Sequence, residues 1–291
     1  MISGIIGSKS CQLPKIASQV PGHVHSDSRT KQFSRWVQNE TITFDLYSRS
    51  VPFVGPLLER LAAVRPLVLI MDGSLVARGC VTLMVSVIYA HRAIPIGWLV
   101  IEDAKGHSPT QTHLALVREV KTRVPETATV ISRSVGDGEF DSPELQAELD
   151  GYHWHAQYVC RTAKNILIGV DDDWLSMADL AVTRAGHDFR KQVLFTQAAY
   201  SDHKSRGFQI DRSHLSDPER VHRLLMAASL AYLWVICLGT LAQADHWRPR
   251  IHRRHRCDLS LFQLGLRLLD YRLGHEQPLP SSFVLEPESV R

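Results

Sequence analysis

The sequence predicts an α/β protein with a mixed β-sheet flanked by helices, and two observations carry that prediction. The first is a series of apolar segments between residues 66 and 103, separated by short polar breaks, which is typical of neighbouring strands. The second is that two later strand-like segments are each preceded by a helical pattern, as crossover connections require. The 291 residues are 44% hydrophobic and 22% charged, an ordinary globular composition for one large domain or two small ones.

The order of the elements places a small helical region before the sheet. Residues 1–65 are polar and mixed, and they contain two amphipathic helical patterns. From residue 66 we expect the order β-β-β-α-β-α-β followed by long helices, with a hairpin around His91 and Arg92. We therefore predict a helical N-terminal region at 1–65 and an α/β domain at 66–291. The expected helices are 25–39, 54–64, 108–124 and 141–152, and the expected strands are 66–72, 80–91, 93–103, 128–137 and 155–163.

One apolar stretch allows two interpretations. Residues 224–242 carry no charge and are just long enough to cross a bilayer. We favour a helix buried in a large core, because nothing else in the chain has membrane character and the two flanks are equally basic. The five cysteines form no CxxC pair, and the first residues lack a basic start followed by an apolar segment, so we expect no secretory signal. We expect no zinc site, a reducing cytoplasmic location and no membrane partner.

Two of the predicted strands end on an aspartate, Asp72 in the first and Asp137 in the fourth. Each residue alone is more typical of a turn or a cap. In a sheet whose first and fourth strands are neighbours, however, both carboxylates meet at one edge. Carboxylate oxygens suit Mg²⁺ or Mn²⁺, and two such ions about 3.5–4 Å apart activate a water and stabilise the leaving oxygen of a phosphodiester. Such a site needs a third acid on a later helix.

A basic run follows the apolar stretch. Residues 246–256 read HWRPRIHRRHR and contain no acid. Contact with nucleic-acid phosphates is one interpretation of such a run, and a solvated surface loop is the other. The arginines of the run are Arg248, Arg250, Arg253, Arg254 and Arg256.

Several stretches resemble a known family of enzymes. They include IMDGSLVARG at 70–79, SVGDGEFDSPELQAEL at 134–149 and the long segment 201–239. Together with the strand order, they resemble the insertion-sequence transposases of the large fourth family, which are DDE transposases with an RNase H-like fold. The resemblance covers most of the chain and implies metal-dependent hydrolysis at transposon ends followed by strand transfer. It implies that Asp72 and Asp137 are the first two catalytic acids and hold two Mg²⁺ or Mn²⁺ ions.

The chain departs from this family at the third acid. The family helix carries the signature Y-x2-R-x3-E-x6-K, and placing its Lys at Lys204 puts Gln197 where Glu is expected. Neither the Arg nor the Tyr of the signature is matched. An internal loss between Tyr200 and Ser201 explains the departure and predicts impaired catalysis. Glu219 is a candidate replacement, although an acid in the first turn of a helix is the simpler interpretation.

DNA is the partner that the resemblance implies. Lys204 and Arg206 join the arginine run as candidate phosphate contacts, and residues 1–65 are a further candidate for DNA binding. We also expect a homodimer on DNA. The alternative function is a non-catalytic DNA-binding remnant that pairs with intact transposase and inhibits it. A third acid within reach of Asp72 and Asp137 separates the two functions.

Overall fold

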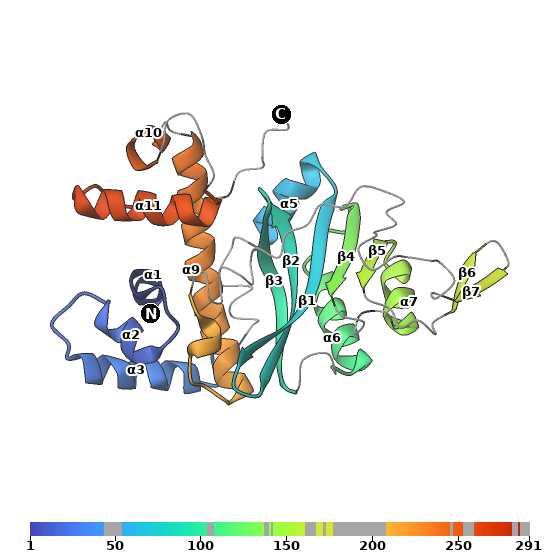
Figure 1. Cartoon of the computed structure of the whole chain (residues 1–291), viewed down its shortest axis with the longest axis horizontal. Helices are drawn as coiled ribbons and strands as arrows, with labels where there is room; N and C mark the ends of the chain where they lie inside the picture. Colours follow the sequence, from blue (N-terminus) through green and yellow to red (C-terminus); the bar gives the residue numbers. More distant parts are fainter. Residues whose placement is uncertain are drawn as a thin grey trace.

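Helices form the two ends of the chain, and a five-stranded sheet lies between them (Figure 1). The N-terminal helices are α1 (Ile2–Ser8), α2 (Leu13–Ser18), α3 (Ser26–Gln38) and α5 (Val54–Val64). The two amphipathic segments predicted near the N-terminus are thus helices. The computed structural model describes residues 1–43, 54–103, 108–136, 140, 142–160, 167–170, 173–176, 208–244, 247–252, 259–280 and 285.

The sheet is mixed, as the apolar pattern predicts. Its strand order is β3-β2-β1-β4-β5, in which β1 pairs antiparallel with β2 and β2 with β3, whereas β4 pairs parallel with β1 and with β5. Helices α6 and α7 form the connections that precede the parallel strands. The bounds are β1 (Leu67–Ala77), β2 (Cys80–Tyr89), β3 (Arg92–Glu102), α6 (Thr110–Lys121), β4 (Val130–Gly136), α7 (Pro143–Gly151) and β5 (His155–Cys160).

A tight hairpin joins β2 to β3. Its two turn residues, Ala90 and His91, both have positive φ, 46° and 58°. Two consecutive residues with positive φ are the geometry of a type I′ turn, whose twist matches that of the paired strands. The predicted hairpin is confirmed, and the turn lies one residue before the predicted His91–Arg92 junction.

The remaining elements complete the C-terminal part. A small hairpin of β6 and β7, which the apolar pattern did not predict, follows the five-stranded sheet in sequence. Long helices then follow, as predicted. The bounds are β6 (Leu167–Val170), β7 (Asp173–Ser176), the 3-10 turn η2 (Ile210–Arg212), α9 (Pro218–Ala244), α10 (Arg248–Ile251) and α11 (Leu261–Gly274).

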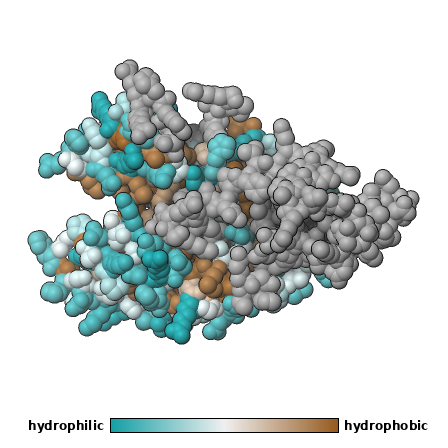
Figure 2. Space-filling view, viewed as in Figure 1, coloured by the Kyte–Doolittle hydropathy of each residue, from teal (hydrophilic) through white to brown (hydrophobic). Residues whose placement is uncertain are grey.

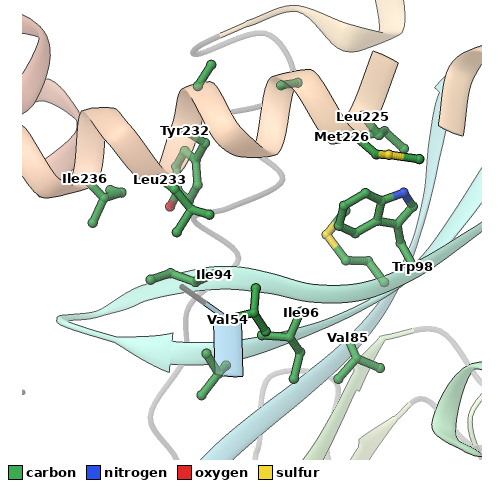
Figure 3. Packing of buried hydrophobic residues seen from close by; sticks show 14 of the residues in the cluster. Val54, Val85, Ile94, Ile96, Trp98, Leu225, Met226, Tyr232, Leu233 and Ile236 are labelled. Carbon is green, nitrogen blue, oxygen red and sulfur yellow. The ribbon is translucent and has the colours of Figure 1, made fainter. Parts of the chain in front are cut away.

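Helix α9 is a core helix that packs against the sheet. Trp98 of β3, which is 0% exposed, lies beneath Leu225 and Met226 of α9 (Figure 3). Helix α9 is long and apolar enough to cross a membrane, but 78% of its most apolar window is buried inside the protein. This burial is typical of the core helix of a soluble protein, and it explains why the helix is apolar on every side.

Two glycines bring α9 and α11 into backbone contact. A Cβ added at Gly239 would lie 2.1 Å from the carbonyl oxygen of Leu261, and one added at Gly265 would lie 1.9 Å from that of Val235. Both distances are far below van der Waals contact, so no larger residue fits at either position without separating the helices. The two helices therefore cross at a point that only glycine permits.

A buried arginine of α9 donates hydrogen bonds to the end of α3 and to the residues that follow it. Arg223 is 5% exposed, and its Nη1 and Nε donate to the carbonyl oxygens of Val37 and Ile42 at 3.1 and 3.2 Å. Its Nη2 donates to Glu219 at 3.2 Å. All three guanidinium nitrogens are therefore satisfied, which is the condition under which a buried arginine is tolerated.

Candidate functional site

Asp72 lies within β1 and not at its end. The prediction that the strand stops at Asp72 is wrong, because residues 73–77 continue the antiparallel ladder with β2 as far as the pair Ala77–Cys80. On the side of β4 the parallel ladder runs only from Leu67–Val130 to Met71–Ser134. Asp72 is therefore the first residue beyond the parallel ladder, on the central strand of the sheet.

The strand that precedes Asp137 is the neighbour of β1, as predicted. Strand β4 ends at Gly136, and Asp137 is the next residue, outside those that the structure describes. Met71 and Ser134 are the last pair of the parallel ladder. Asp72 is the next residue after Met71, and Asp137 is the third residue after Ser134. The first and fourth strands thus have the adjacency on which the two-aspartate prediction depends.

The side chain of Asp72 shares a face of the sheet with apolar residues. Asp72 is the register partner of Met84, which in turn is the partner of Trp98, and paired residues of antiparallel strands lie on the same face. Asp72 is half-buried, and Ser74, two residues further on, is buried. Because Trp98 contacts α9 (Figure 3), the face that carries Asp72 is also the face that α9 crosses.

Glu219 of α9 pairs with an arginine of its own helix and lines a cavity that does not include Asp72. Glu219 is the one acid in this helix, its side chain is 76% exposed, and it pairs with Arg223. It lines an open polar cavity of about 510 Å³ between the end of α3 and the start of α9. The lining residues are Gln38, Glu40, Asp217, Glu219, Arg220 and Arg223, and Asp72 is not among them.

The structure adds a histidine that the sequence did not single out. His222 of α9 lies with its ring 5.8 Å from that of Trp98, on the face of Asp72. The pKa of His222 is lowered to about 4, mainly because the imidazole is buried. The charge of Glu119 opposes this shift, and the charge of Arg223 adds to it. The imidazole is therefore neutral at pH 7. The chain has 15 histidines, and nothing in the local sequence distinguishes His222 from the others.

Part of the predicted basic surface is described. Arg248 and Arg250 belong to α10, and the guanidinium of Arg250 lies 5.2 Å from the ring centroid of Trp247. Sequence reasoning missed Arg272 of α11, whose guanidinium lies 5.0 Å from the same ring. The other predicted site residues lie outside the described residues: Lys204, Arg206, Arg253, Arg254 and Arg256, together with Gln197.

Neither a metal cluster nor a relative identifies the site. Among the described residues, which exclude Asp137, no group of three or more His, Cys, Asp or Glu side chains is placed to hold a metal ion. Comparison with family models, curated proteins and solved structures finds no match for the chain. The geometry and the sequence are therefore the basis for assigning a function.

Proposed function

We propose that the chain is a DDE transposase of the insertion-sequence type whose catalytic site has lost its third acid. Asp72 and Asp137 would hold Mg²⁺ or Mn²⁺, and the two ions would align a water or a 3′-hydroxyl with a DNA phosphodiester. DNA is the partner, bound as transposon ends and target, and a homodimer on DNA and a cytoplasmic location belong to the same proposal. The fold would then be RNase H-like.

The observation that carries the proposal is the strand order together with the position of the acids. Three antiparallel strands followed by two parallel ones, in the order β3-β2-β1-β4-β5, support an RNase H-like sheet. Asp72 lies on the central strand just past the parallel ladder, and Asp137 directly follows the neighbouring strand. Two acids 65 residues apart in sequence are thereby assigned to adjacent strands.

The loss of the third acid rests on the sequence, in which Gln197 stands where the family signature has Glu. Among the described residues, the helix that crosses the face of Asp72 is where a replacement acid could lie. Its one acid, Glu219, is held by Arg223 and lines a cavity beside α3. Two carboxylates in place of three supply less negative charge for a pair of divalent cations, so the second ion would bind weakly. Weak binding of the second ion implies that the chain no longer cuts DNA. For its present activity this supports the alternative function, a non-catalytic DNA-binding remnant that pairs with intact transposase and inhibits it.

We expect the chain to leave transposon ends uncut. The test is an end-cleavage assay with Mg²⁺ or Mn²⁺ on DNA carrying the ends of the encoding element, with Asp72→Asn as the control for site-dependent cleavage. A Gln197→Glu change should not restore cutting, because the resemblance implies that the insertion and the register of the family helix are lost together with the acid. Inserting a family-like segment between Tyr200 and Ser201 is the change expected to restore it. Robust cleavage that disappears in Asp72→Asn would show that a complete site exists.

The salt dependence of DNA binding tests the basic run. Each arginine that neutralises a phosphate releases condensed counterions, so the slope of log K against log [salt] is about −0.9 per contact on duplex DNA. Replacing Arg253, Arg254 and Arg256 together with alanine should reduce the slope by about 2–3, measured by fluorescence anisotropy. The exposed Arg78, in the turn between β1 and β2, provides the control Arg78→Ala. An unchanged slope in the triple variant would remove the run from the interface.

A further inference from the structure

A cluster of arginines and aromatic rings joins α10 to α11. Arg250 and Arg272 both lie over the ring of Trp247, at 5.2 and 5.0 Å from its centroid, and Tyr271 meets the same ring edge-on at 5.7 Å. Cation–π contacts of this kind fix a guanidinium plane while leaving its outward N–H groups able to donate. In Figure 2 the α10–α11 part of the molecule, at the upper left, shows hydrophilic and hydrophobic residues side by side.

The arginines of this cluster bond neutral oxygen atoms and a histidine ring rather than carboxylates, within the residues that the structure describes. Arg267, which is exposed, donates to the carbonyl oxygen of Ile251 at 3.3 Å and bonds His252 at 2.9 Å, and Nη1 of Arg272 donates to the carbonyl oxygen of Pro278 at 2.6 Å. In the described part of the chain no carboxylate pairs with Arg250, Arg267 or Arg272. Arg250 and Arg272 lie over one ring, and Arg267 bonds the end of α10, so three guanidinium groups share the α10–α11 surface. Like charges repel one another, and an external anion reduces that repulsion.

A stacked pair of rings lies beside these cations. Tyr271 and His275 are parallel, with 4.0 Å between ring centroids and 19° between their planes. His275 is exposed, and its Nδ1 bonds the carbonyl oxygen of Tyr271 at 2.8 Å, which holds the imidazole flat on the phenol ring. The outer face of His275 thus extends an ordered aromatic stack toward solvent. An exposed ring beside fixed guanidiniums is the combination that binds unpaired nucleic-acid strands, whose bases stack while their phosphates meet the cations.

We infer that the α10–α11 surface binds an unpaired DNA strand, with Arg250, Arg267 and Arg272 on its phosphates and a base stacked on His275. A duplex offers the same phosphates but keeps its bases paired and stacked, so it makes only the ionic part of the contact. This inference rests on the proposal that the chain binds DNA. It deepens that proposal by naming the form of DNA that this surface takes.

The experiment compares two probes on the full-length chain. Fluorescein-labelled oligothymidine and a labelled duplex are titrated by anisotropy with the unmodified chain, His275→Ala, His275→Tyr and Arg267→Ala. Loss of one stacked base should weaken oligothymidine binding about tenfold in His275→Ala and leave duplex binding within about twofold. His275→Tyr, which keeps a flat ring, should retain the affinity, whereas Arg267→Ala should weaken both probes and flatten both salt slopes.

The possible failures are distinguishable. In one outcome the unmodified chain binds the duplex, and His275→Ala binds oligothymidine with unchanged affinity. This outcome overturns the stacking inference, while DNA binding stands. Equal weakening of both probes in His275→Ala also overturns it, because a stacking contact is specific to the unpaired strand. If the unmodified chain binds neither probe, the inference and the DNA partner of the proposed function are both wrong. His275 is exposed, so these variants are expected to fold, and equal thermal midpoints check that.

Discussion

Replacing Gly265 with alanine is expected to lower the free energy of unfolding by about 3 kcal/mol, the upper part of the range for overpacked sites. The added Cβ would lie 1.9 Å from the carbonyl oxygen of Val235 and 3.0 Å from the backbone nitrogen of Gly239. Both are backbone atoms of α9, so no side-chain rotation can relieve the overlap. The two helices must separate, and the buried residues around the crossing, among them Phe262 and Leu264, then lose contacts.

The matched control is in the same helix. Gly274, the last residue of α11, has nothing within 4 Å of its added Cβ, and it is exposed. Gly274→Ala should therefore change the unfolding free energy by less than about 1 kcal/mol, because only helix propensity changes. Urea titrations followed by circular dichroism give both values. Equal effects of the two alanines would show that the close approach of α9 and α11 is not a feature of the folded protein.

Arg223→Ala is expected to have an effect of similar size, about 3 kcal/mol, because it breaks a buried and fully bonded cation. The substitution removes the donors to the carbonyl oxygens of Val37 and Ile42 and leaves a cavity at a residue that is 5% exposed. It also releases Glu219. The N-terminal helices should therefore loosen first, which hydrogen exchange of α3 amides would detect as lost protection.

Arg220 provides the control for Arg223. It lies on the same helix less than one turn earlier, and it lines the same polar cavity. Arg220→Ala should change the unfolding free energy by no more than about 0.5 kcal/mol, as is usual for surface substitutions. Arg223→Lys keeps the charge but cannot present three nitrogens in a plane, so it should fall between Arg223→Ala and the unmodified chain. An Arg223→Ala chain as stable as Arg220→Ala would contradict the assigned bonds.

Local pattern was sufficient to predict most elements but not how far they extend. The apolar run 66–72 predicts a strand, yet β1 continues to Ala77 because Gly73–Ala77 pair with β2, a non-local contact that a local pattern does not register. The apolar pattern predicts the hairpin although its turn contains neither Gly nor Asn. The predicted turn is one residue too late, because Ala90 and His91 are unusual residues at positive φ. The mixed sheet follows from element order, since crossover connections favour parallel strands.

The candidate site was predictable only in part. The expected adjacency of the first and fourth strands is confirmed, whereas the position of Asp72 inside the central strand, and not at its end, is visible only in the structure. The partner of Glu219 and the neutral state of His222 depend on how α9 packs, which no spacing reveals. Likewise Arg272 is brought to Trp247 by the packing of α10 against α11, which local sequence does not reveal.

Iron-directed cleavage of the polypeptide tests the central claim most directly, namely that Asp72 and Asp137 share a divalent-cation site. Fe²⁺ bound in such a site generates hydroxyl radicals with ascorbate and peroxide, which cut the backbone beside its ligands. Two cuts are expected, one next to Asp72 and one next to Asp137, and Mn²⁺ should suppress both. Asp72→Asn and Asp137→Asn should each abolish both cuts, whereas the exposed Asp150→Asn should change neither. A cut at Asp137 that persists in Asp72→Asn, or the absence of cuts at both aspartates, would contradict a shared site.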